Sequence, residues 1–177
     1  MNIIIGPPGT GKTTRLLSLV EEQLETTSPE SIGYFAFTNR ASDEAKSRAN
    51  IKFNLENDSL PYFRTLHSLA FQQLGMSRSQ VFNEEQRLGI IEVARVKGIP
   101  TRQQWSQDNP DISWYEIERA ERGLLEYKKA RNLYDFTDML SLFLSQNSAP
   151  ALEVVFVDEA QDLSFLQWQI VFQLKKL

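Results

Sequence analysis

The sequence predicts an α/β domain with a mostly parallel sheet and a small helical insertion. Three observations lead to this fold class. A short apolar run at 2–5 is followed by a glycine-rich loop and then by a helix-like segment. Further strand-like and helix-like segments alternate along the chain, which is typical of parallel sheets. Residues 75–132 read as entirely helical, so we assign the α/β domain to 1–74 plus 133–177 and treat the middle as the insertion.

Composition and charge exclude several classes of protein. The chain of 177 residues is 41% hydrophobic, with a net charge of −4, no Cys and one His. Disulfides, iron–sulfur clusters and thiolate zinc sites are therefore excluded. The acidic balance argues against binding nucleic acid by bulk charge but leaves a local basic track open. No apolar run approaches the roughly 18 residues that span a bilayer, so we expect a cytoplasmic protein without membrane contact.

The glycine-rich loop has the G-x-x-x-x-G-K-T pattern of a phosphate-binding P-loop. Its residues are Gly6, Pro7, Pro8, Gly9, Thr10, Gly11, Lys12 and Thr13, followed by Thr14. Glycines let successive backbone N–H groups turn toward phosphate oxygens. We expect residues 6–14 to bind a nucleotide, with Lys12 reaching its β- and γ-phosphates and the Thr13 hydroxyl binding Mg²⁺. The alternative, a glycine-rich turn before a capped helix, is disfavoured because a strand-like run precedes the loop.

The elements of the α/β part follow from apolar spacing and from turn residues. The run at 2–5 is typical of a strand buried on both faces of a parallel sheet. The loop then leads into a helix, because leucines recur there at helical spacing. This helix is predicted over 12–24. Further strands are predicted over 32–37, 62–66 and 153–157, and further helices over 67–74, 135–144 and 165–174, with one more helix that starts near Thr38 or Asn39.

The insertion is predicted to hold two helices. The first starts near Asn83 and stops before Gly98 and Pro100, and the second runs from Asp111 or Ser113 to Arg131. The second helix ends in the basic cluster 128–131. This cluster is either a track for phosphates or a solvated helix end favoured by the macrodipole, and we favour the solvated end.

Two acidic residues directly follow the apolar run 154–157. A P-loop needs a carboxylate at the end of another strand to hold Mg²⁺ and a base to orient the attacking water. Asp158 comes directly after the strand, where ligands of open α/β sheets bind, so we assign it to Mg²⁺. Glu159 is assigned to polarising the water as a general base. The alternative is a pair of solvated acids, and the complete P-loop disfavours it.

Four further segments carry recognisable patterns. Residues 158–162 (DEAQD) and 37–41 (FTNRA) resemble, respectively, the DExQD motif II and the motif Ia of UvrD/Rep-type superfamily 1 DNA helicases. Residues 65–70 (TLHSLA) look like motif Ib, and 134–140 (YDFTDML) look like the DFDDLL segment that precedes motif II. Together with the P-loop, these segments extend over nearly the whole chain.

The resemblance implies a RecA-like P-loop domain with a small 1B-like insertion, and roles for particular residues. Lys12, Thr13, Asp158 and Glu159 keep the roles given above, and Gln161 would couple the state of the γ-phosphate to DNA contacts. Contacts with the backbone of single-stranded DNA are implied for Thr38, Asn39, Thr65 and His67. From the residues alone, Thr38 and Asn39 are better explained as a helix cap, and both roles are compatible.

The sequence departs from the family pattern in two places. No adenine-recognising Q-motif precedes the first predicted strand, so ATP is favoured mainly because no guanine signature is present. The second RecA-like domain has no counterpart in this chain, nor do its arginines, which are typically worth about 10³–10⁵ in rate. We therefore expect a fragment or a shortened protein that binds nucleotide weakly and hydrolyses it very slowly. A P-loop kinase and a non-hydrolysing nucleotide or single-strand binding module are the alternatives.

Overall fold

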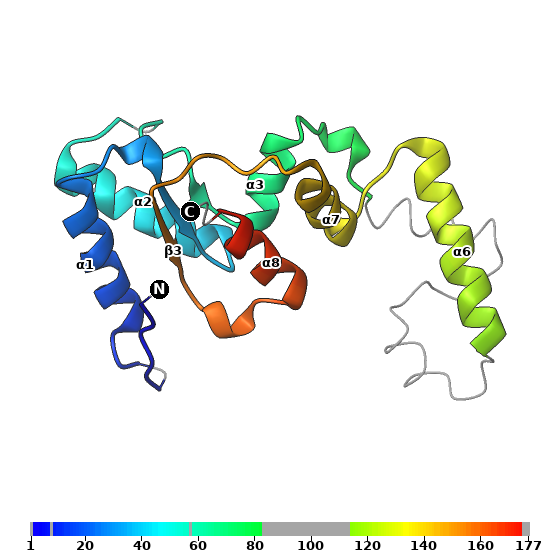
Figure 1. The fold of residues 1–177 in the computed structure, drawn as a ribbon, viewed down its shortest axis with the longest axis horizontal. Coiled ribbons are helices and arrows are strands. Elements are labelled where there is room, and N and C mark those ends of the chain that lie inside the picture. The colour runs from blue at the N-terminus through cyan, green and yellow to red at the C-terminus, as the bar shows by residue number, and fades with distance from the viewer. Residues whose placement is uncertain (1, 8, 57, 83–113, 175–177) are drawn as a thin grey trace. The chain divides into compact units, whose positions relative to one another are not determined.

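A computed structural model describes residues 2–7, 9–56, 58–82 and 114–174. Within these residues the chain forms a three-stranded parallel sheet and six α-helices (Figure 1). The strand order is β2-β1-β3, so β1 lies in the centre and pairs with both β2 and the last strand, β3. Parallel neighbours joined by helical crossovers define an α/β fold, and the predicted class, a RecA-like P-loop domain, is confirmed.

The elements have the following bounds. The strands are β1 (Ile32–Phe35), β2 (Phe63–Arg64) and β3 (Val154–Val157). The α-helices are α1 (Lys12–Leu24), α2 (Asn39–Phe53), α3 (Leu66–Gln73), α6 (Trp114–Arg131), α7 (Phe136–Gln146) and α8 (Phe165–Leu174). Short 3₁₀ turns lie at Pro29–Ser31, Arg78–Gln80 and Ala160–Asp162. Helices α1 and α8 have the predicted bounds, whereas the predicted insertion helix that starts at Asn83 lies outside the described residues.

Strand register fixes which side chains share a face of the sheet. Tyr34 of β1 lies opposite Phe63 of β2 and Phe156 of β3. Because side chains alternate along a strand, Ile32 and Tyr34 point to one face of β1 while Phe35 points to the other. The two faces accordingly belong to two separate hydrophobic clusters.

Helices cover both faces of the sheet. On one face Tyr34 and Phe156 pack with side chains of α1 and α2, including Leu17, Val20 and Ala45. On the other face Phe35 packs with buried side chains of three helices, namely Leu66 and Leu69 of α3, Phe143 of α7 and Ile170 of α8. A sheet buried on both faces explains why its strands are continuous apolar runs and do not alternate with polar residues.

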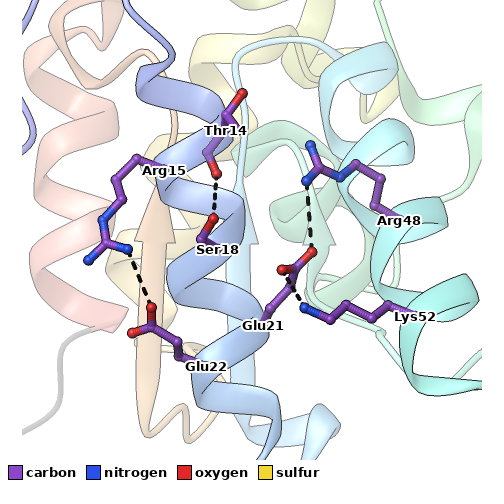
Figure 2. A network of polar contacts seen from close by, with 7 residues as sticks. All are labelled: Thr14, Arg15, Ser18, Glu21, Glu22, Arg48 and Lys52. Carbon is purple, nitrogen blue, oxygen red and sulfur yellow. Dashed lines mark hydrogen bonds and ion pairs between the residues drawn. The ribbon is translucent and has the colours of Figure 1, made fainter.

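Ion pairs connect the first two helices at their surface. Glu21 of α1 lies 2.7 Å from Lys52 and 3.8 Å from Arg48 of α2. Figure 2 shows this carboxylate pointing toward both basic side chains. Surface ion pairs of this kind contribute little to folding stability individually. The two helices are held against the sheet mainly by their buried apolar faces.

The predicted strand over 2–5 is wrong. These residues form no strand and pair with neither edge of the three-stranded sheet. Ile3 and Ile5 are 69% and 90% exposed. The apolar run has a suitable composition, but a strand also needs a neighbour that accepts and donates its hydrogen bonds, and the described sheet does not provide one here.

The chain divides into two compact units. The first comprises Met1–Gly75 and Met139–Leu177 and contains the sheet, while the second comprises Met76–Asp138. The assignment of a helical insertion to 75–132 stays a prediction, because residues 83–113 lie outside the described part. In the described ranges, no helix has the length and apolar character needed to cross a membrane.

In the second unit a buried lysine forms an ion cluster with two partly exposed carboxylates, at the place where we expect a solvated helix end. Lys128 of α6 is only 7% exposed. Its Nζ donates to Asp135 Oδ2 at 2.7 Å and to Asp138 Oδ2 at 2.6 Å. Burial alone would lower the pKa of Lys128, but hydrogen bonds to the two carboxylates outweigh it and raise that pKa. The solvated-end interpretation is therefore wrong for Lys128, although Lys129 beside it is exposed.

Candidate functional site

All three strands end at one edge of the sheet, and the candidate residues follow those ends. Thr65 comes directly after β2, Thr38 follows β1 after two residues, and Asp158 comes directly after β3. Backbone bonds keep the strands together at this edge, since Asp158 N donates to Phe35 O at 2.9 Å. Residues from three distant parts of the sequence therefore lie along the carboxyl edge, where open parallel sheets bind ligands.

The P-loop has the backbone that its glycines predict. Gly9 and Gly11 adopt positive φ angles of 79° and 78°, which side chains with a Cβ rarely tolerate. A Cβ on Gly6 would lie 2.6 Å from Thr10 Oγ1, so the Thr10 hydroxyl, which donates to Pro7 O, would have to move. Pro8 lies outside the described residues. The loop leads directly into α1 at Lys12, as predicted.

The P-loop lysine lies along its own loop. Lys12 Nζ donates to Gly6 O at 2.9 Å and to Pro7 O at 3.1 Å. Thr10 Oγ1 donates to the same Pro7 carbonyl at 2.7 Å. The ammonium group is thereby held inside the curve of the loop by two neutral acceptors. Phosphate oxygens would be stronger partners for it, because charge-assisted hydrogen bonds are roughly twice as strong as neutral ones.

The start of α1 and the end of β3 meet at Thr13 and Asp158. Thr13 Oγ1 lies 3.4 Å from Asp158 Oδ1 and 3.3 Å from Oδ2, although 145 positions separate the two residues. The carboxylate is 7% exposed, and its Oδ1 accepts a 3.0 Å hydrogen bond from the backbone N–H of Glu159. A buried carboxylate thus faces a threonine hydroxyl at the mouth of the P-loop.

This pair fits a magnesium–nucleotide complex. Mg²⁺ prefers oxygen ligands and usually takes one or two from the protein, with water and phosphate oxygens supplying the others. Thr13 and Asp158 provide one hydroxyl and one carboxylate, and their separation is at the long limit of a hydrogen bond. Both groups therefore remain available to a cation that binds between them or beside them.

Glu159 lies in a strained backbone conformation next to this carboxylate. Its φ is 50° and its ψ is 42°, the left-handed region that only a few per cent of non-glycine residues adopt. The side chain is exposed, and Gln161 Nε2 donates a hydrogen bond to Glu159 Oε2. Strain of this kind costs about 1–3 kcal/mol and clusters at functional sites, where the structure around it maintains it.

The four residues implied in DNA contact lie at two helix starts. Thr38 caps α2 by accepting a 3.3 Å hydrogen bond from Ala41 N, which confirms the cap expected from the residues alone. Asn39 is exposed in the first turn of the same helix. Thr65 caps α3 through a 3.2 Å bond from Ser68 N. His67 is partly buried in the first turn of α3, and burial lowers its pKa.

Sequence reasoning missed Tyr34, whose hydroxyl donates to Asp158 Oδ2 at 3.0 Å. Tyr34 is 0% exposed. Burial, followed by the charge of Asp158 and the hydrogen bond to it, raises the pKa of Tyr34 above its ordinary value. The available signal was a tyrosine inside an otherwise apolar strand, because a buried phenol needs a hydrogen-bond partner.

A P-loop and a buried carboxylate at the carboxyl edge of a parallel sheet define the class of P-loop NTPase domains. Comparison with known families agrees: the family model described as an AAA domain matches residues 1–177. The chain belongs to this family of AAA, or P-loop, domains, which is found in UvrD/Rep-like helicases. Domains of this class generally bind ATP with Mg²⁺. A search of curated proteins finds no match.

Proposed function

We propose that this chain is the ATP-binding part of a UvrD-like DNA helicase. In the complete motor, ATP hydrolysis would drive translocation on single-stranded DNA. The observation that carries the proposal is that Asp158, which contacts Thr13 of the P-loop, follows one strand of the sheet, while the implied DNA residues follow the other two strands at the same edge. Thr13 and Asp158 lie 3.3 Å apart there, and β1, which leads to Thr38, directly neighbours β3.

The nucleotide would be held by the P-loop and by the end of β3. Lys12 would exchange its two loop carbonyls for phosphate oxygens, and Thr13 with Asp158 would bind Mg²⁺. The metal ion neutralises charge on the phosphates when it is bound. Glu159 would accept a proton from the attacking water. Gln161, which donates a hydrogen bond to Glu159, would couple the state of the γ-phosphate to the DNA contacts.

Single-stranded DNA would bind at the starts of α2 and α3. Helix N-termini attract phosphate groups through free N–H donors and the helix dipole. Thr38 and Asn39 supply polar side chains at the first start, and Thr65 and His67 at the second. Contacts of this kind hold the DNA backbone without reading its sequence. A second RecA-like domain is the further partner that we propose, because it would bring the arginines that stabilise the charge of the γ-phosphate.

The test measures nucleotide binding and turnover separately, with and without single-stranded DNA. Lys12→Ala should weaken nucleotide binding by at least about 10-fold, since it removes the charge that meets the phosphates. Glu159→Gln should keep nucleotide affinity within about twofold. With a second RecA-like domain supplied, so that the wild type turns over measurably, it should lower turnover by roughly 10²–10⁴, the usual contribution of a general base. Glu153→Gln, an exposed acid just before β3, is the matched control and should behave like the wild type.

The result also distinguishes the other functions. If DNA changes neither binding nor turnover and a small phosphoryl acceptor is consumed, the chain is a P-loop kinase. If nucleotide binds but Glu159→Gln and the wild type turn over at the same background rate, even with a second RecA-like domain supplied, the non-hydrolysing binding module is correct. Either outcome contradicts the helicase proposal.

A further inference from the structure

The hydrogen bond between Tyr34 and Asp158 connects the centre of the sheet to the candidate metal ligand. Tyr34 lies in β1, opposite Phe156, and Asp158 lies two residues beyond Phe156. Since side chains alternate along a strand, Tyr34, Phe156 and Asp158 share one face of the sheet. The phenol therefore reaches the carboxylate from inside the core, on the face covered by α1 and α2.

The carboxylate is held at both of its oxygens. Oδ2 accepts from the Tyr34 hydroxyl at 3.0 Å, and Oδ1 accepts from the Glu159 amide at 3.0 Å. Rotation about the Cβ–Cγ bond of Asp158 would break both bonds. The carboxylate plane is therefore fixed while both oxygens still face the Thr13 hydroxyl. A ligand fixed in advance loses less conformational freedom when it binds a cation.

Tyr34 is itself held firmly as a hydrogen-bond donor. Its ring stacks on Phe63 of β2, with centroids 5.5 Å apart and an interplanar angle of 20°. Tyr34 is 0% exposed, so the packing around its ring fixes the direction in which the hydroxyl points.

We propose that Tyr34 is a positioning residue for the metal-binding carboxylate, orienting Asp158 toward Thr13 so that the magnesium–nucleotide complex meets a preformed ligand. The inference rests on the proposed function, because it takes Asp158 as a ligand of Mg²⁺. Partners that orient metal ligands typically change metal affinity by 10–100-fold when they are removed. Tyr34 would act through Asp158, without touching the nucleotide.

The experiment compares nucleotide affinity with and without Mg²⁺ in the wild type, Tyr34→Phe and Tyr134→Phe. Phenylalanine keeps the ring that stacks on Phe63 and removes only the hydroxyl. Tyr134→Phe is the matched control, because its hydroxyl binds Asn132 and no residue of the site. A fluorescent ATP analogue is titrated in excess EDTA, and Mg²⁺ is then titrated at saturating analogue.

We expect Tyr34→Phe to weaken Mg²⁺ affinity by about 10-fold while metal-free affinity for the analogue stays within about twofold. A merely structural role would lower both affinities together, and that outcome overturns the inference. Unchanged Mg²⁺ affinity also overturns it. Failure of the proposed function appears differently: the wild type itself would then show no gain in affinity on addition of Mg²⁺.

A second measurement uses the wild type alone and covers the case in which Tyr34→Phe does not fold. The chain has five tyrosines, and their ring carbons are labelled with ¹³C. Mn²⁺ with the ATP analogue should broaden the resonance of one tyrosine strongly, because paramagnetic relaxation falls steeply with distance. If all tyrosine resonances stay sharp while Mn²⁺ is bound, Tyr34 does not lie beside the metal and the inference fails.

Discussion

Glu159 has a backbone conformation that its side chain disfavours. It is one of the non-glycine residues with positive φ in the described chain, and it directly follows the candidate metal ligand Asp158. Asn occupies the other such positions, Asn54, Asn132 and Asn147, and tolerates the left-handed region well. A glutamate at this place is therefore retained despite its backbone cost, which fits a chemical role.

Replacing Glu159 should reveal that cost. Glu159→Gly should raise the free energy of unfolding by roughly 1 kcal/mol relative to Glu159→Ala, because glycine adopts φ of 50° without a Cβ clash. Both variants lack the carboxylate, so the comparison isolates the backbone. Urea unfolding followed by circular dichroism measures the difference. Equal stability of the two variants would mean that the conformation at 159 is not strained in solution.

Thr65 provides a second test at the level of a single residue. Its hydroxyl oxygen caps α3 through Ser68 N, and the residue is 9% exposed. Thr65→Ala should lower the free energy of unfolding by about 0.5–2 kcal/mol, and Thr65→Ser should restore most of it. Equilibrium unfolding of the three proteins tests this. If Thr65→Ser is as unstable as Thr65→Ala, the lost stability comes from packing of the threonine methyl group and not from the cap.

Those features of the site that depend only on nearby residues could be predicted from the sequence. The P-loop glycines and the cap at Thr38 could be predicted, because each depends on neighbours within a few residues. Tyr34 could not, since its contact with Asp158 depends on the register between two strands more than 100 positions apart. The pairing of Lys128 with two carboxylates was also missed, because it depends on the geometry of the turn between α6 and α7.

The start of helix α7 forms a closed set of hydrogen bonds with Lys128. Asp138 N donates to Asp135 Oδ1 and Asp135 N donates to Asp138 Oδ2, both at 2.9 Å. This reciprocal pattern resembles a capping box, and Lys128 forms ion pairs with both of its carboxylates. Burial alone would raise the pKa of Asp135, but hydrogen bonds from Lys128 and from backbone amides lower it below its ordinary value of 3.8.

This cluster should make the second unit sensitive to acid. Because the pKa of Asp135 is lowered on folding, its contribution to stability is present above about pH 4 and is lost as the pH falls through the lowered value. Lys128→Met should reduce the free energy of unfolding at pH 7 by about 1.5–3 kcal/mol and flatten its acid dependence. Unfolding measured from pH 2 to 7 checks both effects, with Lys129→Met as the exposed control. A Lys128→Met profile parallel to that of the wild type would contradict the assignment.

At the level of elements, helices were predicted more closely than strands. Amphipathic spacing and caps lie within the helix itself, so α1 and α8 were predicted with their observed bounds. A strand depends on partners elsewhere in the chain. The apolar run at 2–5 has the composition of a strand but no pairing neighbour in the described sheet, and β2 is two residues long where five were predicted.

The nucleotide residues and the ion cluster of Lys128 belong to different compact units. Lys12, Thr13 and Asp158 all lie in the first unit, and the cluster lies in the second. A ligand that binds only the folded state stabilises the unit that holds it, by about 2.7 kcal/mol at a concentration of 100 times its Kd. The two units should therefore respond differently to nucleotide.

Calorimetry should resolve this difference. Mg²⁺ with a non-hydrolysable ATP analogue at 100 times Kd should raise the Tm of the first unit by several degrees. Lys12→Ala should abolish most of the shift at the same concentration, whereas Lys129→Ala should retain it. A shift that survives in Lys12→Ala would show that the analogue binds elsewhere.

The register between β1 and β3 also limits how the length of this sequence can change. Tyr34 meets Asp158 only because it lies on the same face as Phe156. Deleting or inserting one residue in β1 would turn Tyr34 toward the opposite face, even if the strand stayed buried and apolar. Substitutions that keep an apolar strand are compatible with the core. Changes of length in the four residues of β1 would instead remove the hydroxyl from the carboxylate, so this strand should tolerate variation in composition far better than insertions or deletions.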